Sequence, residues 1–172
     1  EKIQNLRAFG ARVVITPTDV APDAPRSYYR VAARIVSETP NSFYANQYHN
    51  PQNPRAHYES TGPEIWKQMD GNIDTLVCGL GTGGTVTGIA KYLKEQNPKI
   101  KVVGVDPIGS IYYDYFKTKK MGKPQTYKIE GIGEDFLPST IDFKFIDEVI
   151  QVNDKESLQM TRRLLTQEGI FV

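Results

Sequence analysis

Hydrophobic residues recur at helical spacing in several parts of the chain. The clearest stripe follows the pattern i, i+3, i+4, i+7 and consists of Val86, Ile89, Ala90 and Leu93. It predicts an amphipathic helix that ends near Asn97-Pro98. Weaker stripes predict helices over 3–9, 27–38 and 63–69, and a fourth after Asn153, where Glu156 completes a capping-box signature.

Short apolar runs rich in β-branched residues predict strands over 12–16, 75–78, 101–105 and 145–152. A glycine-rich turn over 79–84 separates the second run from the helix that begins near Thr85. Strand, turn, helix and strand together form a βαβ unit, which requires parallel strands and a right-handed crossover. We therefore predict an α/β fold with a mostly parallel, twisted sheet and flanking helices.

Composition narrows the function classes. The 172 residues include 21 basic and 20 acidic side chains, giving a net charge of +1, which argues against a general nucleic-acid binder. No apolar run approaches the ~20 residues of a membrane span. The single cysteine, Cys78, excludes an internal disulfide, and with two histidines it makes a poor metal site, so we expect a cytoplasmic protein without a metal.

The two ends of the chain suggest a segment of a longer protein. The sequence begins at Glu1 inside an amphipathic pattern, without an initiator methionine. It ends on an apolar run, Ile170 to Val172, that follows Gly169 and resembles the start of a strand. We expect further residues on both sides.

The glycine-rich turn is the strongest functional signal. The candidate phosphate-binding residues are Gly81, Thr82, Gly83, Gly84 and Thr85. Glycines let backbone N–H groups approach an anion closely, and the following helix presents its positive N-terminal end. The threonine hydroxyls add further donors. A tight turn without a ligand is the plainer alternative, but the strand-to-helix context favours phosphate binding.

A dinucleotide site is a serious rival interpretation. Residues 79–84 also satisfy G-x-G-x-x-G, and Asp106 ends the next strand about 20 residues later, where an acid would bind the ribose of NAD. Three features weigh against it. Thr82 and Thr85 suit a terminal phosphate, a long stretch of α/β sequence precedes the turn, and Asp106 is followed by a proline. The pattern by itself leaves both open.

Three separated segments resemble the cystathionine β-synthase and cysteine synthase family, which are pyridoxal-phosphate (PLP) enzymes of fold type II. The segment 77–85 is similar to the family's phosphate loop, and 47–66 to the segment before it. Residues 130–138, with Glu130-Gly131-Ile132-Gly133, resemble a later active-site loop. The resemblance covers essentially the whole chain. Residues 106–110 are closer to the cystathionine β-synthase form than to the cysteine synthase form.

The resemblance implies a function and a site. PLP would be held by residues 81–85, and Gln47, Gly131, Ile132 and Gly133 are candidates for the substrate loop. The implied reaction is β-replacement on serine or an activated serine, with homocysteine giving cystathionine or, alternatively, sulfide giving cysteine. The implied partners are amino-acid and thiol substrates and a second copy of the chain. Residues 1–40 would belong to a smaller α/β domain and 41–172 to an incomplete larger one.

Departures from the family are equally informative. No lysine here has the family's Ser-x-Lys setting, and the asparagine loop for the substrate carboxylate is missing, so no catalytic residue is assigned. Glu134 stands where animal and fungal cystathionine β-synthases carry tyrosine.

Outside these motifs, we expect His57 to serve as a cap or buried polar group. We expect the run Tyr112 to Phe116 to lie at a dimer interface.

Overall fold

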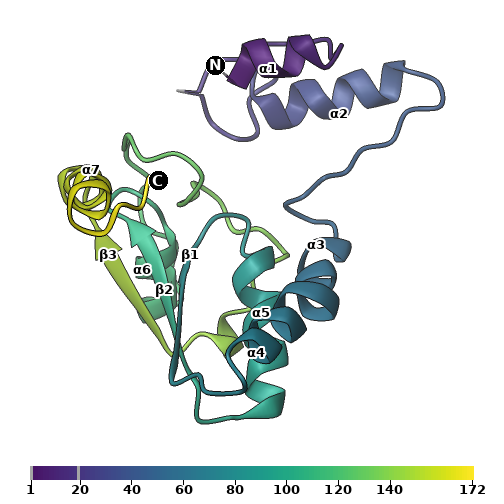
Figure 1. Ribbon diagram of the computed structural model, residues 1–172. Helices are drawn as coiled ribbons and strands as arrows, with labels where there is room; N and C mark the ends of the chain where they lie inside the picture. Colours follow the sequence, from purple (N-terminus) through teal and green to yellow (C-terminus); the bar gives the residue numbers. More distant parts are fainter. Residues whose placement is uncertain (1, 19) are drawn as a thin grey trace. The chain divides into compact units, whose positions relative to one another are not determined.

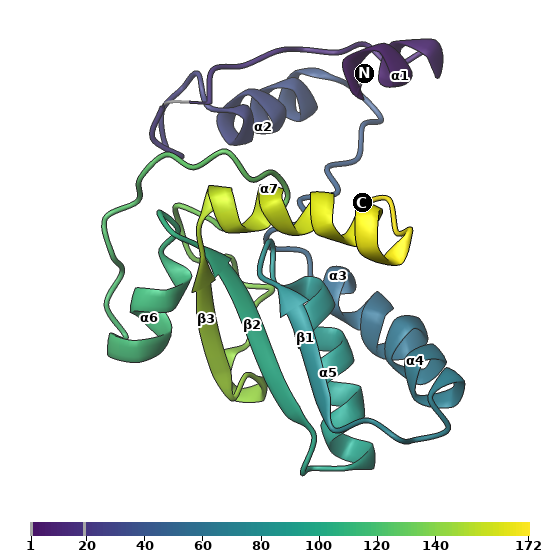
Figure 2. The ribbon, with the colours of Figure 1, turned by 60° about the vertical axis from the view of Figure 1, so that its left-hand side comes forward.

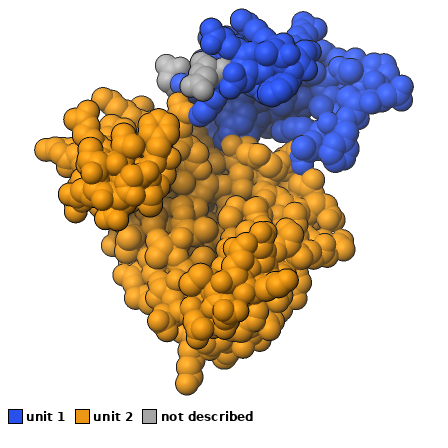
Figure 3. All heavy atoms as spheres, in the orientation of Figure 1, with its two compact units in different colours: residues 1–45 blue, residues 46–172 orange. Residues whose placement is uncertain are grey.

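The computed structural model describes residues 2–18 and 20–172, which divide into two compact units, 1–45 and 46–172 (Figure 3). The prediction placed a domain boundary at 40/41. The assignment of the first unit to the family's smaller domain and of the second to its larger domain stays a prediction. No helix in the described part of the chain has the length and apolar character needed to cross a membrane.

The first unit is built from two helices, α1 (Lys2–Ala8) and α2 (Tyr28–Glu38). Both were predicted, and the Ser27 hydroxyl caps α2 by accepting a hydrogen bond from the Arg30 amide at 3.3 Å. The predicted strand over 12–16 is wrong. A strand needs a neighbour for its hydrogen bonds, and within the described residues of this unit none pairs with it, so Ile15 stays 69% exposed.

The second unit contains a three-stranded sheet whose strands are parallel, as predicted (Figure 1). The structure adds the strand order, β1-β2-β3. Its strands are β1 (Thr75–Gly79), β2 (Lys101–Pro107) and β3 (Glu148–Val152). Helix α5 (Gly84–Gln96) connects β1 to β2 and completes the predicted βαβ unit. β3 begins later than predicted, because η2 (Phe143–Phe145) is a 3-10 turn whose amide at Lys144 bonds to the Asp142 carboxylate.

A continuous helical stretch packs on α5. It consists of α3 (Gln52–Ala56), the π-helical η1 (His57–Thr61) and α4 (Gly62–Gln68). The sequence over 47–54 is polar and rich in asparagine and proline, which predicts a loop, but the helix already begins at Gln52. The reason is local: Pro51 holds φ at −64°, and the Asn50 side chain accepts from the Gln52 amide at 3.0 Å, which starts the helix.

The remaining helices follow β2 and β3. They are α6 (Tyr112–Thr118), α7 (Asp154–Arg163) and the π-helical η3 (Leu164–Glu168). Asn153 and Glu156 form the predicted capping box at the start of α7. In Figure 2, α7 runs past the carboxyl ends of the strands, away from the side where α5 lies. Residues 170–172 form no strand, contrary to the prediction, and Phe171 is 85% exposed.

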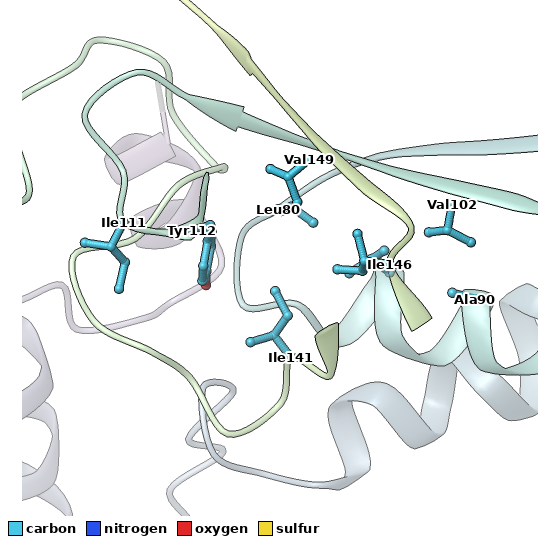
Figure 4. Close-up of a cluster of buried hydrophobic side chains, with 9 residues drawn as sticks. Leu80, Ala90, Val102, Ile111, Tyr112, Ile141, Ile146 and Val149 are labelled. Atoms are coloured by element: carbon cyan, nitrogen blue, oxygen red, sulfur yellow. The ribbon is translucent and has the colours of Figure 1, made fainter. Parts of the chain in front are cut away.

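The core lies between α5 and the sheet and continues to the start of α6 (Figure 4). Its buried members are Leu80, Val86, Ala90, Val102, Ile111, Tyr112, Ile141, Ile146 and Val149. The predicted stripe on α5 is fully confirmed, since all four of its residues are buried. Tyr112 is fully buried, so the expectation that the run from Tyr112 to Phe116 forms an interface is wrong for this residue. Its ring packs against Phe143 instead.

Candidate functional site

The glycine-rich turn lies where β1 ends and α5 begins, at the carboxyl edge of the sheet (Figure 1). Gly83 is the residue before α5 and has φ +81°, a left-handed conformation that favours glycine. A Cβ at this position would also lie 2.7 Å from the Ile141 Cα. The chain can therefore make this turn only with glycine at position 83.

Hydrogen bonds from the core hold the turn from behind. The buried Tyr112 hydroxyl donates to the Gly81 carbonyl at 2.6 Å, and the Thr140 hydroxyl donates to the Thr82 carbonyl at 2.6 Å. The Gly83 carbonyl accepts the first helical bond of α5, from the Thr87 amide. With these carbonyls engaged by the protein, the start of α5 can present backbone amides such as those of Thr85 and Val86 to an anion.

A cavity of about 370 Å³ opens in front of the turn. Its lining consists of glycine backbone and uncharged polar or ring side chains, with one valine: Gln47, Asn53, His57, Gly79, Gly81, Thr82, Gly83, Thr85, Val86 and Gly131. No lysine or arginine occurs among these lining residues. An anion here would be held by backbone amides, hydroxyls and the positive end of α5.

Two side chains from the helical stretch 52–61 reach the threonines of the turn. The Asn53 Nδ2 lies 3.0 Å from the Thr82 Oγ1 and 2.7 Å from the Gln47 carbonyl. The His57 Nε2 lies 3.2 Å from the Thr85 Oγ1, and its Nδ1 lies 3.0 Å from the Thr61 Oγ1. Both threonines are therefore anchored from the same direction.

Sequence reasoning missed Asn53 and gave His57 only a capping or buried polar role. A signal was present, because the two residues are spaced i, i+4 and so share one helix face. It was obscured by the prediction that the chain is a loop through Pro54. His57 has the partner that the sequence did not reveal.

The structure separates the four substrate-loop candidates. Gln47 and Gly131 line the cavity, next to Gly81. Ile132 and Gly133 do not line it. The Ile132 side chain packs against Gly79, and the Gly133 amide donates to the Leu80 carbonyl at 2.6 Å. These two residues fasten the loop to the end of β1, while Gly131 faces the open space.

The rival dinucleotide interpretation needs an exposed acid at Asp106, and the structure buries it. Asp106 is fully buried, and its Oδ2 accepts from the Tyr113 amide at 2.9 Å. Burial raises the pKa of this carboxyl to about 6, while hydrogen bonds from Ser110 and the Tyr113 amide act in the opposite direction. A ribose could not reach this carboxylate.

A larger hollow of about 730 Å³ lies along α7. Its lining includes Lys128, Leu158, Arg162 and Phe171, and it contains none of the residues of the glycine-rich turn. It contains no predicted site residue either. The predicted site residues that line a cavity all lie at the smaller one.

Comparison with known proteins finds similar sequences over the whole chain. A family model described as pyridoxal-phosphate dependent enzyme matches residues 1–172. The chain is 49% identical to a cystathionine beta-synthase of Dictyostelium discoideum and 44% identical to one of Saccharomyces cerevisiae, over 99% and 100% of its length. It spans 34% and 35% of those two proteins. The chain is also 37% identical, over its whole length, to an O-acetylserine dependent cystathionine beta-synthase of Bacillus subtilis, and it spans 53% of that protein.

Proposed function

Because this chain belongs to the family of pyridoxal-phosphate dependent enzymes, we propose that it forms the phosphate-binding part of a cystathionine β-synthase. The chain spans about a third of the length of most of the curated relatives it matches, so the activity is proposed for the full protein. Serine or an activated serine would be the first substrate and homocysteine the thiol. Cysteine synthesis from sulfide is the alternative.

The observation that carries the proposal is the turn 81–85 with its cavity. Glycine is required at position 83, and a Cβ at Gly81 would lie 2.7 Å from the Gly131 carbonyl, so the backbone itself forms the wall. A phosphate monoester fits such a wall, since it accepts hydrogen bonds from amides at a helix start. These residues fit the phosphate of PLP.

The cofactor, when bound, would supply the electron sink for β-replacement. The residues of this chain would hold and orient it. Gly81 to Thr85 would bind the phosphate, and Gln47 and Gly131 would lie beside it at the rim of the cavity. The group that bonds covalently to the cofactor is not among the lining residues, because no lysine lines the cavity.

A comparison of thiols on the purified full-length protein tests the activity. We expect the catalytic efficiency with homocysteine to exceed that with sulfide, with serine and with O-acetylserine as separate first substrates. The narrower support for homocysteine is that residues 106–110 resemble the cystathionine β-synthase form and that the relatives named above carry that name. A strong preference for O-acetylserine with sulfide, and negligible cystathionine, would assign the protein to the cysteine synthases.

Gly131 offers a second arm of the same experiment. It has φ +87°, lies at the cavity and has open space around the position of a Cβ. Homocysteine needs more room than sulfide because it carries an amino-acid group of its own. We expect Gly131→Ala to lower the efficiency with homocysteine more than the efficiency with sulfide. Equal losses for both thiols would remove Gly131 from thiol selection.

A further inference from the structure

We propose that Asn53 and His57 are positioning residues that direct the hydroxyl protons of Thr82 and Thr85 toward the bound phosphate. The inference rests on the proposed phosphate site and adds the side chains that hydrogen-bond to its two threonines. A threonine hydroxyl can donate one hydrogen bond and accept two, so its value to an anion depends on where its single proton points. Both threonines receive a partner that settles this direction.

Asn53 fixes the direction for Thr82. Its Nδ2 contacts the Gln47 carbonyl at 2.7 Å, and a carbonyl can only accept, which identifies this end of the amide as the donor. The same nitrogen lies 3.0 Å from the Thr82 Oγ1, so that oxygen accepts. The Gly84 amide approaches it as a second donor at 3.4 Å. With both accepting positions used, the proton of Thr82 remains for the ligand.

His57 can do the same for Thr85. Its two ring nitrogens face two hydroxyls, the Thr61 Oγ1 at 3.0 Å from Nδ1 and the Thr85 Oγ1 at 3.2 Å from Nε2. In the tautomer with the proton on Nε2, Thr61 donates to Nδ1 and the ring donates to Thr85. The proton of Thr85 is then free for an anion. The other tautomer would consume it, so a phosphate in the cavity selects the first.

The close packing of 52–61 on α5 makes this arrangement rigid. A Cβ at Gly84 would overlap the Asn53 side chain, and a Cβ at Gly88 would lie 2.7 Å from the His57 Cβ. Two glycines one helical turn apart thus leave room for exactly the two side chains that reach the threonines. The direction of the Thr82 hydroxyl is set before the ligand arrives, which lowers the entropy cost of binding.

A double-mutant cycle on the full-length protein tests the His57 arm. The cofactor is removed, and the protein is titrated with 4′-deoxypyridoxine 5′-phosphate, a PLP analogue without the aldehyde, so that phosphate contacts are measured without the covalent bond. We expect His57→Phe, which keeps a ring but no donor, to weaken binding about fivefold to tenfold, as for the loss of one neutral hydrogen bond. In a Thr85→Val background it should add less than about twofold, because the two residues act as one unit.

Further variants separate positioning from a general structural role. His57→Gln places a donor near the position of Nε2 and should recover most of the lost affinity. In a Thr82→Val background, His57→Phe should keep its full effect. The corresponding pair Asn53→Leu and Thr82→Val should show the same non-additivity. Ser60 is exposed on the same π-helix, and its hydroxyl donates to the Ala56 carbonyl at 2.6 Å; Ser60→Ala should leave affinity unchanged.

The ³¹P NMR signal of the bound analogue gives a second measurement. We expect it to move in His57→Phe and to return toward the wild-type position in His57→Gln. Additive effects of His57→Phe and Thr85→Val, or no recovery by glutamine in either measurement, would overturn the inference while leaving the phosphate site in place. Failure of the wild-type protein to bind the analogue would overturn the proposed function itself, and this inference with it.

Discussion

At the scale of single residues, the site depends on what the glycines permit. Gly83 provides a left-handed turn that ends against Ile141, and Gly84 leaves space that the Asn53 side chain fills. The first is a backbone requirement and the second a packing requirement. In the proposed arrangement, Thr82 and Thr85 then supply the directed hydroxyls.

We expect Gly83→Val to weaken PLP binding by more than about tenfold, because valine at φ +81° is strained and its side chain would collide with Ile141. Thr82→Val should weaken it only severalfold, since it removes one donor among several. Binding is measured by absorbance titration of cofactor-free full-length protein. Gly169→Ala is the control, because Gly169 has φ +67° with nothing within 4 Å of a Cβ. If Gly169→Ala weakens PLP binding as much as Gly83→Val does, backbone strain anywhere in the chain is enough to explain the loss of affinity.

Asp106 gives a prediction on pH. Its pKa is raised to about 6 by burial, so between about pH 4 and pH 6 the folded protein keeps a proton that the unfolded chain releases. The free energy of unfolding therefore falls as pH rises through this window, by on the order of 3 kcal/mol for this group. Asp106→Asn does not titrate and should remove that slope. Urea unfolding at several pH values measures it.

Asp147 is a control because its pKa is shifted in the opposite direction. Burial by itself would raise the pKa of this carboxyl, but hydrogen bonds from Lys94 and the Val102 amide hold it below its ordinary value. Its stabilisation is present above about pH 4 and is lost at lower pH. Asp147→Asn should therefore leave the slope between pH 4 and pH 6 intact. An unchanged slope in Asp106→Asn would show that Asp106 does not titrate in that window.

At the scale of elements, the site is made where the helical stretch 52–61 meets α5. Backbone packs against backbone at Gly88, where a Cβ would collide with the Pro54 carbonyl and lie 2.8 Å from the Tyr58 amide nitrogen. The two elements are joined in sequence only through α4 and β1. Their packing brings Asn53 and His57 to a turn that lies about 30 residues later.

We expect Gly88→Val to separate these elements. The added side chain overpacks a contact between backbones, which costs about 1–3 kcal/mol of unfolding free energy, and it also moves Asn53 and His57 away from the threonines. Both the denaturant midpoint and the affinity for PLP should fall. Gln96→Val, an equally β-branched change at an exposed position of α5, should cost less than about 1 kcal/mol and leave affinity unchanged. Normal PLP affinity in Gly88→Val would contradict the role given to this packing.

At the scale of the whole molecule, we propose that the 172 residues supply a phosphate cradle without a group for covalent attachment of the cofactor. The lining of the cavity contains no lysine, and no lysine of the sequence has the family's setting. We expect these 172 residues alone, incubated with PLP, serine and homocysteine, to form no cystathionine above the rate of PLP alone, measured by mass spectrometry. The full-length protein is the positive control. Turnover by the shorter chain would show that covalent attachment through the missing lysine is not required.

The local pattern determined a large part of this fold. The stripe from Val86 to Leu93, the capping box at Asn153 and the βαβ order were predicted because each depends on residues within a few turns of one another. The position of the glycine-rich turn followed from the same pattern. Its glycines and threonines also predicted phosphate binding from their own chemistry.

Long-range packing decided what the pattern could not. The apolar run at 12–16 lacks a strand partner in the described residues, and a strand is not stable without one. Asp106 fits a dinucleotide fingerprint by spacing, yet the turn into α6 buries it. His57 has Thr85 as a hydrogen-bond partner only because the stretch 52–61 packs on α5 and brings its ring to that hydroxyl. Sequence spacing fixes which face of an element a residue occupies, whereas tertiary structure fixes what that face meets.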